Sequence, residues 1–415
     1  MGEKKLVPKR RFKAFELDWE EKSFESLAEI VRGASPRPIE DPKWFDSNSN
    51  TGWLRISDVT SQNGRIINLE QKISVLGQQK TRVLTNSHLL LSIAATVGKP
   101  VINYVKTGVH DGFLIFLKPK FDIEYMYQWL EMFRSKWQQY GQPGSQVNLN
   151  SDIVKKHILL IPGIEEQQKI GKFFKVLDDR IANQERKIAK VKSLKDAYLT
   201  EMFPQEGETV PKRRFKGFDG EWILKTLNSI CPDISDGDWI ENEYINDSGK
   251  YRIIQTGNLG LGKFLNRESF SKYISQDSFK ILKANEIFPG DILTSRLAEP
   301  AGRTIIVPNI NKRMVTVVDV AIIRNSDSFN EYFLVTQMNS KNVLSKINEN
   351  VSGTSHKRIS RRNLEKTLLI APRDIKEQQK IGEFFKNLDN QIETEEKKLD
   401  KLQKMKEAYL EEMFV

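Results

Sequence analysis

The phrase "EQQKIGKFFK" occupies residues 166–175, and "EQQKIGEFFK" occupies residues 377–386, so the chain carries the same ten residues twice with one change. At a constant offset of 211, residues 165–203 align with residues 376–414, and 22 of the 39 pairs are identical. Chance does not produce identity of this extent over such a length. The two segments are therefore copies of one structural unit.

Each copy has the apolar pattern of a long helix in a coiled coil. Apolar residues recur at alternating spacings of four and three, which is typical of a coiled-coil seam. At 1.5 Å per residue, each helix would be about 58 Å long. Polar residues interrupt the seam at equivalent positions, Gln184 and Lys195 in the first copy and Glu395 and Lys406 in the second, so the interruptions belong to the repeat. The predicted seam residues are Ile170, Phe174, Leu177, Ile181, Ile188 and Val191 in the first helix, and Ile381, Phe385, Leu388, Ile392, Leu399 and Leu402 in the second.

The starts of both helices can also be predicted. Asp374 with Glu377 has the spacing of a capping box, and Gly163 with Glu166 occupies the corresponding positions in the first copy. We therefore expect the helices to begin just after Gly163 and Asp374.

Glycine lies near the start of both helices, as Gly171 and Gly382. A glycine inside a helix costs about 1 kcal/mol relative to alanine. Its presence in both copies indicates the close approach of another backbone, and a flexible kink is the alternative.

The regions before the long helices repeat more faintly. "VPKRRFKAFELDW" at residues 7–19 returns as "VPKRRFKGFDGEW" at residues 210–222. Three weaker correspondences follow: residues 53–59 resemble 253–259, a strand–turn–strand is predicted at 89–102 and 291–306, and a helix is predicted at 124–137 and 331–344. Each half is thus predicted to be a globule of strands and helices followed by one long helix, with boundaries 1–161, 162–203, 204–373 and 374–415.

Length and composition are those of a globular protein with more than one domain. At 415 residues the chain is too long for one ordinary core, and 39% hydrophobic with 29% charged residues is typical of globular domains. Cys231 is the one cysteine, which excludes a disulfide framework or a cysteine-rich zinc site within the chain and fits a reducing cytoplasm. Residues 1–15 lack the apolar run of a secretory signal, and the apolar stretch 89–97 is too short to span a bilayer, so we expect no membrane role.

The net charge of +10 lies outside the repeated helices. Residues 165–203 carry nine Lys/Arg and seven Asp/Glu, and residues 376–414 carry eight and ten, so the two segments sum to zero. The excess therefore lies in the remaining regions, which favours a polyanionic partner there.

The one phosphate-loop candidate does not fit. Residues 257–263 read "GNLGLGK", but Phe264 follows where magnesium coordination needs Ser or Thr. The first half keeps Gly64 and Arg65 at the corresponding place without the phosphate-loop spacing, so a turn is the better interpretation.

Other catalytic patterns are also missing from the sequence. After Asp233 the first acidic-x-Lys tripeptide of a nuclease motif is residues 374–376, far along the chain, and no Pro-Pro pair of an adenine methyltransferase motif occurs. The four histidines, His88, His110, His157 and His356, have no metal-binding spacing. The sequence therefore favours a binding protein over an enzyme.

Together, these motifs resemble one known family. The Pro-x-x-Arg-Phe…Trp patterns at residues 8–19 and 211–222, the "EQQKI" helix starts, and the two unlike globules resemble the specificity subunit of a Type I restriction-modification system. The resemblance covers essentially the whole chain.

The resemblance implies an α+β fold, with two mixed α/β target-recognition domains in a pseudo-twofold tandem repeat, joined by two long helices that form an antiparallel coiled coil. It implies that each domain reads one half of a bipartite site in double-stranded DNA. No cofactor is expected on this chain. S-adenosylmethionine, ATP and Mg²⁺ would be used by its partners, two modification (methyltransferase) subunits and the restriction subunits.

Candidate DNA contacts come from the loops before the long helices and from the strand–turn–strand segments, because their residue types suit base edges and phosphates. The alternative for each is an ordinary solvated loop residue. The candidates are Ser92, Thr96, Lys99, Ser145, Gln146 and Asn148 in the first half, and Ser295, Arg296, Arg303, Thr354, Ser355, His356, Lys357 and Arg358 in the second.

Two other functions remain open from the sequence. A coiled-coil adaptor that binds proteins would explain the helices but not where the positive charge lies. An RNA-binding module lacks its recognisable sequence motifs.

Overall fold

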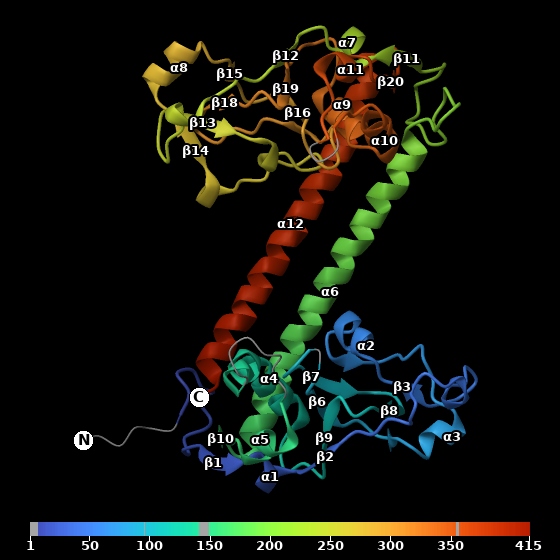
Figure 1. Ribbon diagram of the computed structural model, residues 1–415, viewed down its shortest axis with the longest axis vertical. Helices are drawn as coiled ribbons and strands as arrows, with labels where there is room; N and C mark the ends of the chain where they lie inside the picture. Colours follow the sequence, from blue (N-terminus) through green and yellow to red (C-terminus); the bar gives the residue numbers. More distant parts are fainter. Residues whose placement is uncertain (1–6, 95, 141–148, 354–356) are drawn as a thin grey trace. The chain divides into compact units, whose positions relative to one another are not determined.

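The computed structural model describes residues 7–94, 96–140, 149–353 and 357–415 (Figure 1). Contacts divide the chain into two compact units, residues 1–186 with 397–415, and residues 187–396. Each unit contains one globule and a part of both long helices. The boundaries predicted from the sequence instead made each long helix a segment of its own. No helix in the described ranges is long and apolar enough to cross a membrane.

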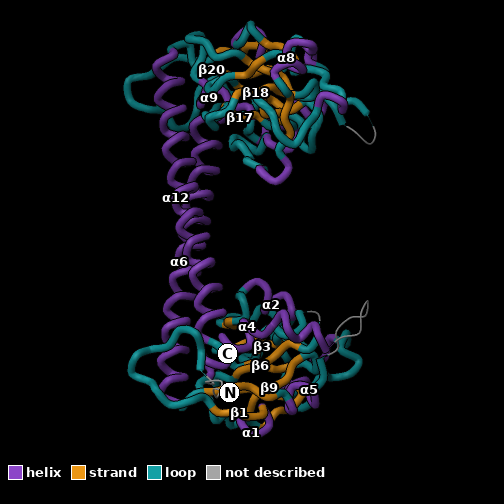
Figure 2. The backbone as a smooth tube through the Cα atoms, turned by 90° about the vertical axis from the view of Figure 1, so that its left-hand side faces the viewer, coloured by secondary structure: helices purple, strands orange, loops and turns teal. Residues whose placement is uncertain are grey.

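The long helices are α6 (Ile164–Met202) and α12 (Ile375–Met413), each of 39 residues. They lie side by side and run antiparallel (Figures 1 and 2). In the second unit Lys187 contacts Glu395 at 2.8 Å, and Lys195, further along α6, contacts Asp389, which is earlier in α12, at 2.5 Å. The predicted antiparallel pair of helices is confirmed.

The predicted seam residues lie on the inner side of this pair. Eight of them are buried, and Ile181, Ile392, Leu399 and Leu402 are half-buried. The first members of each seam also belong to the core of a globule. Phe174 stacks on Phe414 at 5.7 Å between ring centroids in the first unit.

Two of the polar interruptions of the seam, Lys195 and Lys406, pair with aspartates of the opposite helix. Lys406 donates to Asp178 at 2.6 Å in the first unit, and Lys195 donates to Asp389 at 2.5 Å in the second. The two pairs occupy equivalent positions of the repeat, because the two lysines are 211 residues apart in the sequence and so are the two aspartates. A lysine of one helix thus meets an aspartate of the other in each unit, which favours this register and orientation over a shifted or parallel one.

In the described part of the first unit, the globule contains three sheets. The five-stranded sheet has the order β2 (Glu29–Arg32), β9 (Phe113–Leu117), β6 (Leu89–Ser92), β7 (Pro100–Asn103) and β4 (Arg65–Ile66). The three-stranded sheet has the order β3 (Gly52–Trp53), β8 (Thr107–Val109) and β5 (Arg82–Leu84), and β1 (Glu20–Ser23) pairs with β10 (Ile158–Ile161). The shorter helices are α1 (Phe24–Leu27), α2 (Ile56–Ser61), α3 (Val75–Gln78), α4 (Ile123–Phe133) and α5 (Ser151–Lys156), with 3₁₀ turns η1 (Pro42–Trp44) and η2 (Arg134–Tyr140).

The second globule has a related arrangement. One sheet has the order β12 (Ile234–Asp236), β19 (Val320–Ile323), β16 (Ile292–Ser295) and β17 (Thr304–Ile306). The other has the order β14 (Lys272–Ile274), β13 (Tyr251–Ile254), β18 (Arg313–Thr316) and β15 (Glu286–Ile287), and β11 (Ile223–Thr226) pairs with β20 (Leu368–Ala371). The shorter helices are α7 (Leu227–Ile230), α8 (Gln276–Leu282), α9 (Glu331–Met338), α10 (Lys341–Glu349) and α11 (Arg361–Glu365), with 3₁₀ turns η3 (Asn242–Tyr244), η4 (Thr256–Asn258) and η5 (Glu268–Phe270).

The two globules share a common topology with local differences. The β6–β7 hairpin corresponds to β16–β17, and the parallel pair β3–β8 corresponds to β13–β18. Among the described residues, the pairing of strand β4 with β7 is found in the first globule alone. The pairing of strand β14 with β13 is found in the second globule alone. The predicted strand–turn–strand segments are confirmed. The helix predicted at 331–344 is instead two, α9 and α10, because the chain turns at Asn339 and Ser340 caps a new helix.

Strand β6 shows why the stretch 89–97 is so apolar. Leu89 and Leu91 face the core that α4 covers, and Leu90 faces a second core on the opposite side of the sheet. Since both faces of the strand are buried, its sequence is a continuous apolar run rather than an alternating one.

A buried ion pair joins each VPKRRF segment (residues 7–12 and 210–215) to the start of a long helix. Arg11 donates from Nε and Nη2 to the carboxylate of Glu166 at 2.8 and 2.7 Å. Arg214 makes the same two bonds to Glu377 at 2.7 and 2.8 Å. These pairs explain why both phrases are retained in both halves.

The same interaction corrects the predicted capping box. The carboxylate of Glu377 is occupied by Arg214, and Asp374 Oδ1 accepts from the N–H of Lys376 at 2.9 Å. Asp374 therefore caps α12, but Glu377 serves the globule instead of the cap.

Gly171 and Gly382 lie where a second helix begins against the long helix. A Cβ on Gly171 would lie 2.7 Å from the backbone nitrogen of Tyr125 in α4, and one on Gly382 would lie 3.0 Å from that of Phe333 in α9. Both long helices are continuous across these glycines. Close approach of another backbone is thus confirmed over a kink.

We therefore expect Gly171→Ala and Gly382→Ala each to lower the stability of their unit by about 1–3 kcal/mol, as overpacked sites do. Helix propensity alone would give a gain of about 1 kcal/mol. Thermal unfolding of the full chain measures the sign. Gly163→Ala is the control because no atom lies within 4 Å of its Cβ position, and a stabilising Gly171→Ala would contradict the close-packing explanation.

Candidate nucleic-acid interface

Each VPKRRF segment also contacts the end of the other long helix. The backbone N–H of Arg10 donates to the carbonyl of Glu412 at 2.8 Å, and that of Arg213 donates to the carbonyl of Glu201 at 2.8 Å. Their guanidinium groups pair with the same two glutamates. The segment thus contacts α6 and α12 in both units, and we call this constant assembly the joint.

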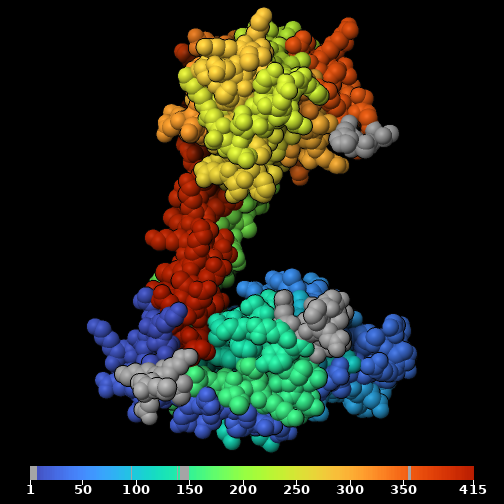
Figure 3. Space-filling model, turned by 60° about the vertical axis from the view of Figure 1, so that its left-hand side comes forward, coloured from blue at the N-terminus to red at the C-terminus, as the bar shows by residue number. Residues whose placement is uncertain are grey.

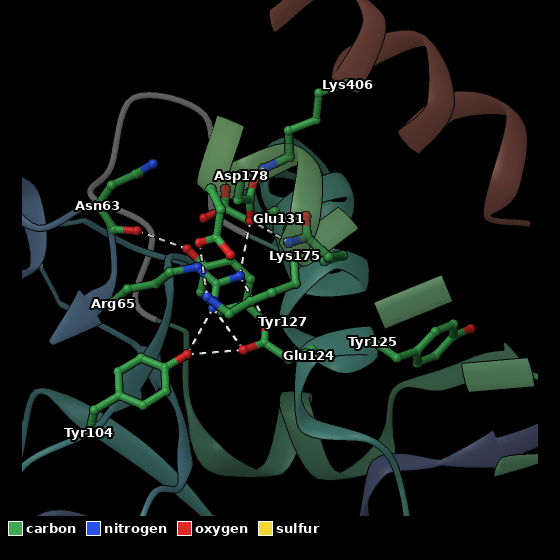
Figure 4. Close-up of polar contacts among 12 residues, drawn as sticks. Asn63, Arg65, Tyr104, Glu124, Tyr125, Tyr127, Glu131, Lys175, Asp178 and Lys406 are labelled. Atoms are coloured by element: carbon green, nitrogen blue, oxygen red, sulfur yellow. Dashed lines mark hydrogen bonds and ion pairs between the residues drawn. The ribbon is translucent and has the colours of Figure 1, made fainter. Parts of the chain in front are cut away.

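A network of charged groups binds the first globule to the helix pair (Figure 4). Asp178 of α6 accepts from Lys406 of α12 at 2.6 Å, from Gln128 at 2.7 Å and from Arg65 at 3.0 Å. Arg65 also donates to Glu124 of α4 at 2.8 Å. Burial alone would raise the pKa of Asp178, but the charges of Lys406 and Arg65 hold it below its usual range.

The second unit lacks this buried connection. Asp389 takes the place of Asp178 and pairs with Lys195, but Lys263, which takes the place of Arg65, donates instead to Glu396 at 3.4 Å. The Lys263 side chain is 59% exposed, against 16% for Arg65. At these equivalent positions, the first globule is therefore attached to the helices by buried ion pairs and the second by an exposed one, while Arg214–Glu377 stays buried.

The strand–turn–strand candidates of the first globule are engaged within the fold. Ser92 is buried and donates from Oγ to the carbonyl of Ala94 at 2.8 Å, and Thr96 is half-buried beside it. Lys99 is buried, donates to Asn63 at 2.8 Å and forms an ion pair with Glu131 of α4. Their placement favours a structural role for Ser92 and Lys99 over contact with a base.

The corresponding residues of the second globule divide into two groups. Ser295 and Arg296 are buried, and Arg296 pairs with Asp236 at 3.1 Å. Arg303 is half-buried, and Arg267 is the charged group near it. Ser295 and Arg296 are thus poorly placed to contact a base.

The loop candidates are described only in part. Arg358 pairs with Asp319 at 3.1 Å, and Lys357 is exposed beside it. Six candidates lie outside the described residues, namely Ser145, Gln146, Asn148, Thr354, Ser355 and His356.

The residues 257–263 form a tight turn. The N–H of Gly260 donates to the carbonyl of Lys263 at 2.9 Å, and the N–H of Gly262 donates to that of Thr304 at 3.1 Å. These amides are occupied by acceptors of the fold itself and do not point at a phosphate. The interpretation as a turn is confirmed.

Sequence reasoning missed Arg267 and Arg65. The exposed side chain of Arg267 lies beside Arg303 and Gly257, within the segment coloured yellow in Figure 3. No repeat or motif singles it out, since its contacts are made across the fold. Arg65 could have been found, because it follows Gly64, and Gly262 occupies the corresponding position in the second half. Its partner Asp178 also lies on a helix whose seam carries polar interruptions.

The different burial of Asp178 and Asp389 predicts unequal effects for equivalent substitutions. Asp178→Ala leaves Arg65 and Lys406 without their shared acceptor and is expected to cost about 3–5 kcal/mol. Asp389→Ala removes a side chain that is 45% exposed and should cost about 0–1 kcal/mol. Thermal unfolding of the full chain, with hydrogen exchange to assign each unit, measures both, and equal losses would contradict the difference in burial.

The contribution of Asp178 should also depend on pH. Because its folded pKa is lowered, the stabilisation is present above the ordinary aspartate value of about 4 and is lost as pH falls through the folded pKa. The stability difference between the wild type and Asp178→Asn should therefore shrink at acid pH.

Known proteins match the chain over both halves. The family model described as Type I restriction modification DNA specificity domain matches residues 16–193 and 219–404. Among solved structures, the Type I restriction-modification S subunit from M. genitalium aligns with a TM-score of 0.65 at 14% identity, covering 99% of each chain.

A second solved chain, from a study of complex assembly and conformational transition in the type I R-M system, aligns with a TM-score of 0.52 at 16% identity. It covers 95% of this chain and 97% of that one. These likenesses show a shared fold over nearly the whole length. Since the family model covers most of both halves, the chain belongs to the family of Type I restriction modification DNA specificity domains.

Proposed function

We propose that this chain recognises a bipartite target in double-stranded DNA, with one globule for each half-site and with the helix pair setting their separation. The observation that carries the proposal is the contrast between constant joints and unlike globules. Arg11–Glu166 and Arg214–Glu377 are the same pair in the same place, while the charged groups around β7 and β17 differ. A common scaffold thus presents two different recognition surfaces.

The length of the helices suits this function. Half-sites on one face of the duplex recur about every 34 Å. A 39-residue helix spans about 58 Å, so one helix pair is long enough to separate two recognition surfaces by at least one turn of DNA.

The chemistry of methylation and cleavage is assigned to partner subunits. We infer that two modification subunits, using S-adenosylmethionine, and ATP- and Mg²⁺-dependent restriction subunits assemble on this chain. The duplicated joints support two equivalent partners, because each unit carries one copy of the same scaffold. The solved chain from the type I R-M system was studied in the context of complex assembly, which fits such partners.

Lengthening the helices should change the distance between half-sites. Seven residues inserted after Arg186 and seven after Glu396, where the chain passes between its two units, keep the phase of the seam and add about 10 Å. At about 3.4 Å per base pair, the spacer should grow by roughly three base pairs. The methylated motifs of cells that carry the variant and its partners give the readout.

The control exchanges the globule within residues 16–160 for that of a relative, which should change one half-site and leave the spacer as it was. New half-site sequences in the insertion variant would show that recognition and spacing are not divided in this way. The absence of any bipartite motif in cells with the wild-type chain would favour a coiled-coil adaptor that binds proteins only.

The purified chain should transfer no methyl group by itself. Labelled methyl transfer from S-adenosylmethionine to target DNA should require the modification subunit, and the saturated complex should contain two modification subunits per chain. Scintillation counting and native mass spectrometry measure these two results. Transfer by the chain alone, or one partner at saturation, would contradict the assignment.

A further inference from the structure

Two equivalent hairpins carry a basic residue at the same position with different neighbours. Lys99 precedes β7, and Arg303 precedes β17. In the first unit, Lys99 is buried and neutralised by Glu131 of α4. The first globule therefore presents no free charge at this position.

The second unit lacks the neutralising carboxylate. Asp122 caps α4 and Asn330 caps α9, and the residues nine positions later are Glu131 and Asn339. The amide of Asn339 holds strand β17 instead. Its Oδ1 accepts from the N–H of Thr304 at 3.1 Å, and its Nδ2 donates to the carbonyl of Thr304 at 2.7 Å. An uncharged side chain thus replaces the acid opposite Arg303.

Arg303 is left with unused hydrogen-bonding capacity. Its Nη2 donates to the carbonyl of Thr256 at a long 3.4 Å, and its buried Nε has no acceptor. Within the described ranges no carboxylate forms an ion pair with this guanidinium, and its side chain makes no other hydrogen bond. A buried guanidinium donor without an acceptor is unfavourable until an acceptor binds.

Arg267 brings a second positive charge to the same place. Its Nη1 lies 3.4 Å from the position of a Cβ on Gly257, the residue after Thr256. Arg267 is exposed and has no ion pair in the described part of the chain. Burial and then the charge of Arg267 lower the pKa of Arg303, which places the two groups within electrostatic reach of each other.

A phosphate group matches this arrangement. Two guanidinium groups repel each other, and an anion with several acceptor oxygens relieves the repulsion and can accept hydrogen bonds from their Nη atoms. Gly257 carries no side chain to cover the site. The neighbouring segment is at the surface, where Phe270 is 76% exposed.

We propose that Arg267 and Arg303 bind a phosphodiester of the DNA backbone, and that the first globule has no equivalent site because Lys99 is already neutralised. The proposal rests on the DNA-binding function above and adds the chemical group and the residues. The two globules would therefore hold their half-sites with unequal electrostatic contributions.

The test measures DNA affinity of the full chain, in complex with its modification subunits, across a range of salt concentrations. Arg303→Gln and Arg267→Gln should each reduce the slope of log K against log salt by about 0.9 and weaken binding roughly three- to tenfold at 0.1 M salt. Preference between target and altered half-sites should not change, since phosphate contacts carry no sequence information.

Arg313→Gln is the matched control. Arg313 lies in the same globule and is 46% exposed, but its guanidinium is paired with Glu286 through two bonds. This variant should keep the wild-type salt slope. A similar slope reduction in Arg313→Gln would mean that any lost charge has this effect and would overturn the assignment.

A second arm locates the phosphate. A series of duplexes is made in which one phosphodiester at a time is replaced by an uncharged methylphosphonate. At one position, the replacement should weaken binding by the wild type to the affinity of Arg303→Gln. The same replacement should not weaken binding by Arg303→Gln any further. Unchanged thermal unfolding of the variants shows that they are folded. Wild-type salt slopes in folded variants would overturn this inference while leaving DNA recognition intact, whereas loss of DNA binding by the wild-type complex would overturn the proposed function itself.

A third arm separates DNA from free phosphate as the ligand. Inorganic phosphate at constant ionic strength should shift the unfolding temperature of the wild type and the variants equally. A shift that depends on Arg303, with an unchanged DNA salt slope, would mean that the site takes free phosphate and would overturn the assignment to the DNA backbone.

Discussion

The buried pair between an arginine of the VPKRRF segment and the glutamate that opens the EQQKI phrase of a long helix is the interaction on which both units depend. Arg11 and Arg214 bind carboxylates that are 3% and 2% exposed, and each does so through two parallel bonds. A buried bidentate pair tolerates little change in geometry, because either partner alone would be a buried charge. It therefore fixes the path of the chain into each globule relative to the helix that leaves it.

Around that constraint the two globules diverge. The first surrounds Arg65 and Lys99 with carboxylates and binds closely to the helices, whereas the second places Lys263 and Arg303 where acids are fewer. At these equivalent positions, the positive charges are thus neutralised to different extents in the two globules. Recognition surfaces can differ in this way because the joints, not the surfaces, maintain the architecture.

The repeated sequence predicts the framework well, whereas the pairings that bury several of the candidate contacts cannot be predicted from it. The long helices, their pairing, the hairpins and the close approach at Gly171 follow from local spacing and from internal comparison. Arg11 and Glu166 lie 155 residues apart, and Lys99 and Glu131 lie on different elements, so no local pattern reveals their pairing. Ser92 and Lys99 have residue types that suit DNA contact, but burial in the folded chain assigns them to the core.

The first unit is built from both ends of the chain, since it contains residues 1–186 and 397–415, while the second is one continuous stretch. Met413 and Phe414 lie in the core of the first unit, so that core remains incomplete until residues 397–415 have also been synthesised. All residues of the second unit are synthesised before residues 397–415, so this unit can fold first, as contiguous domains do during synthesis. The first globule, although made first, therefore reaches its final packing after the second, and the part of its apolar core that Met413 and Phe414 fill stays uncovered until then.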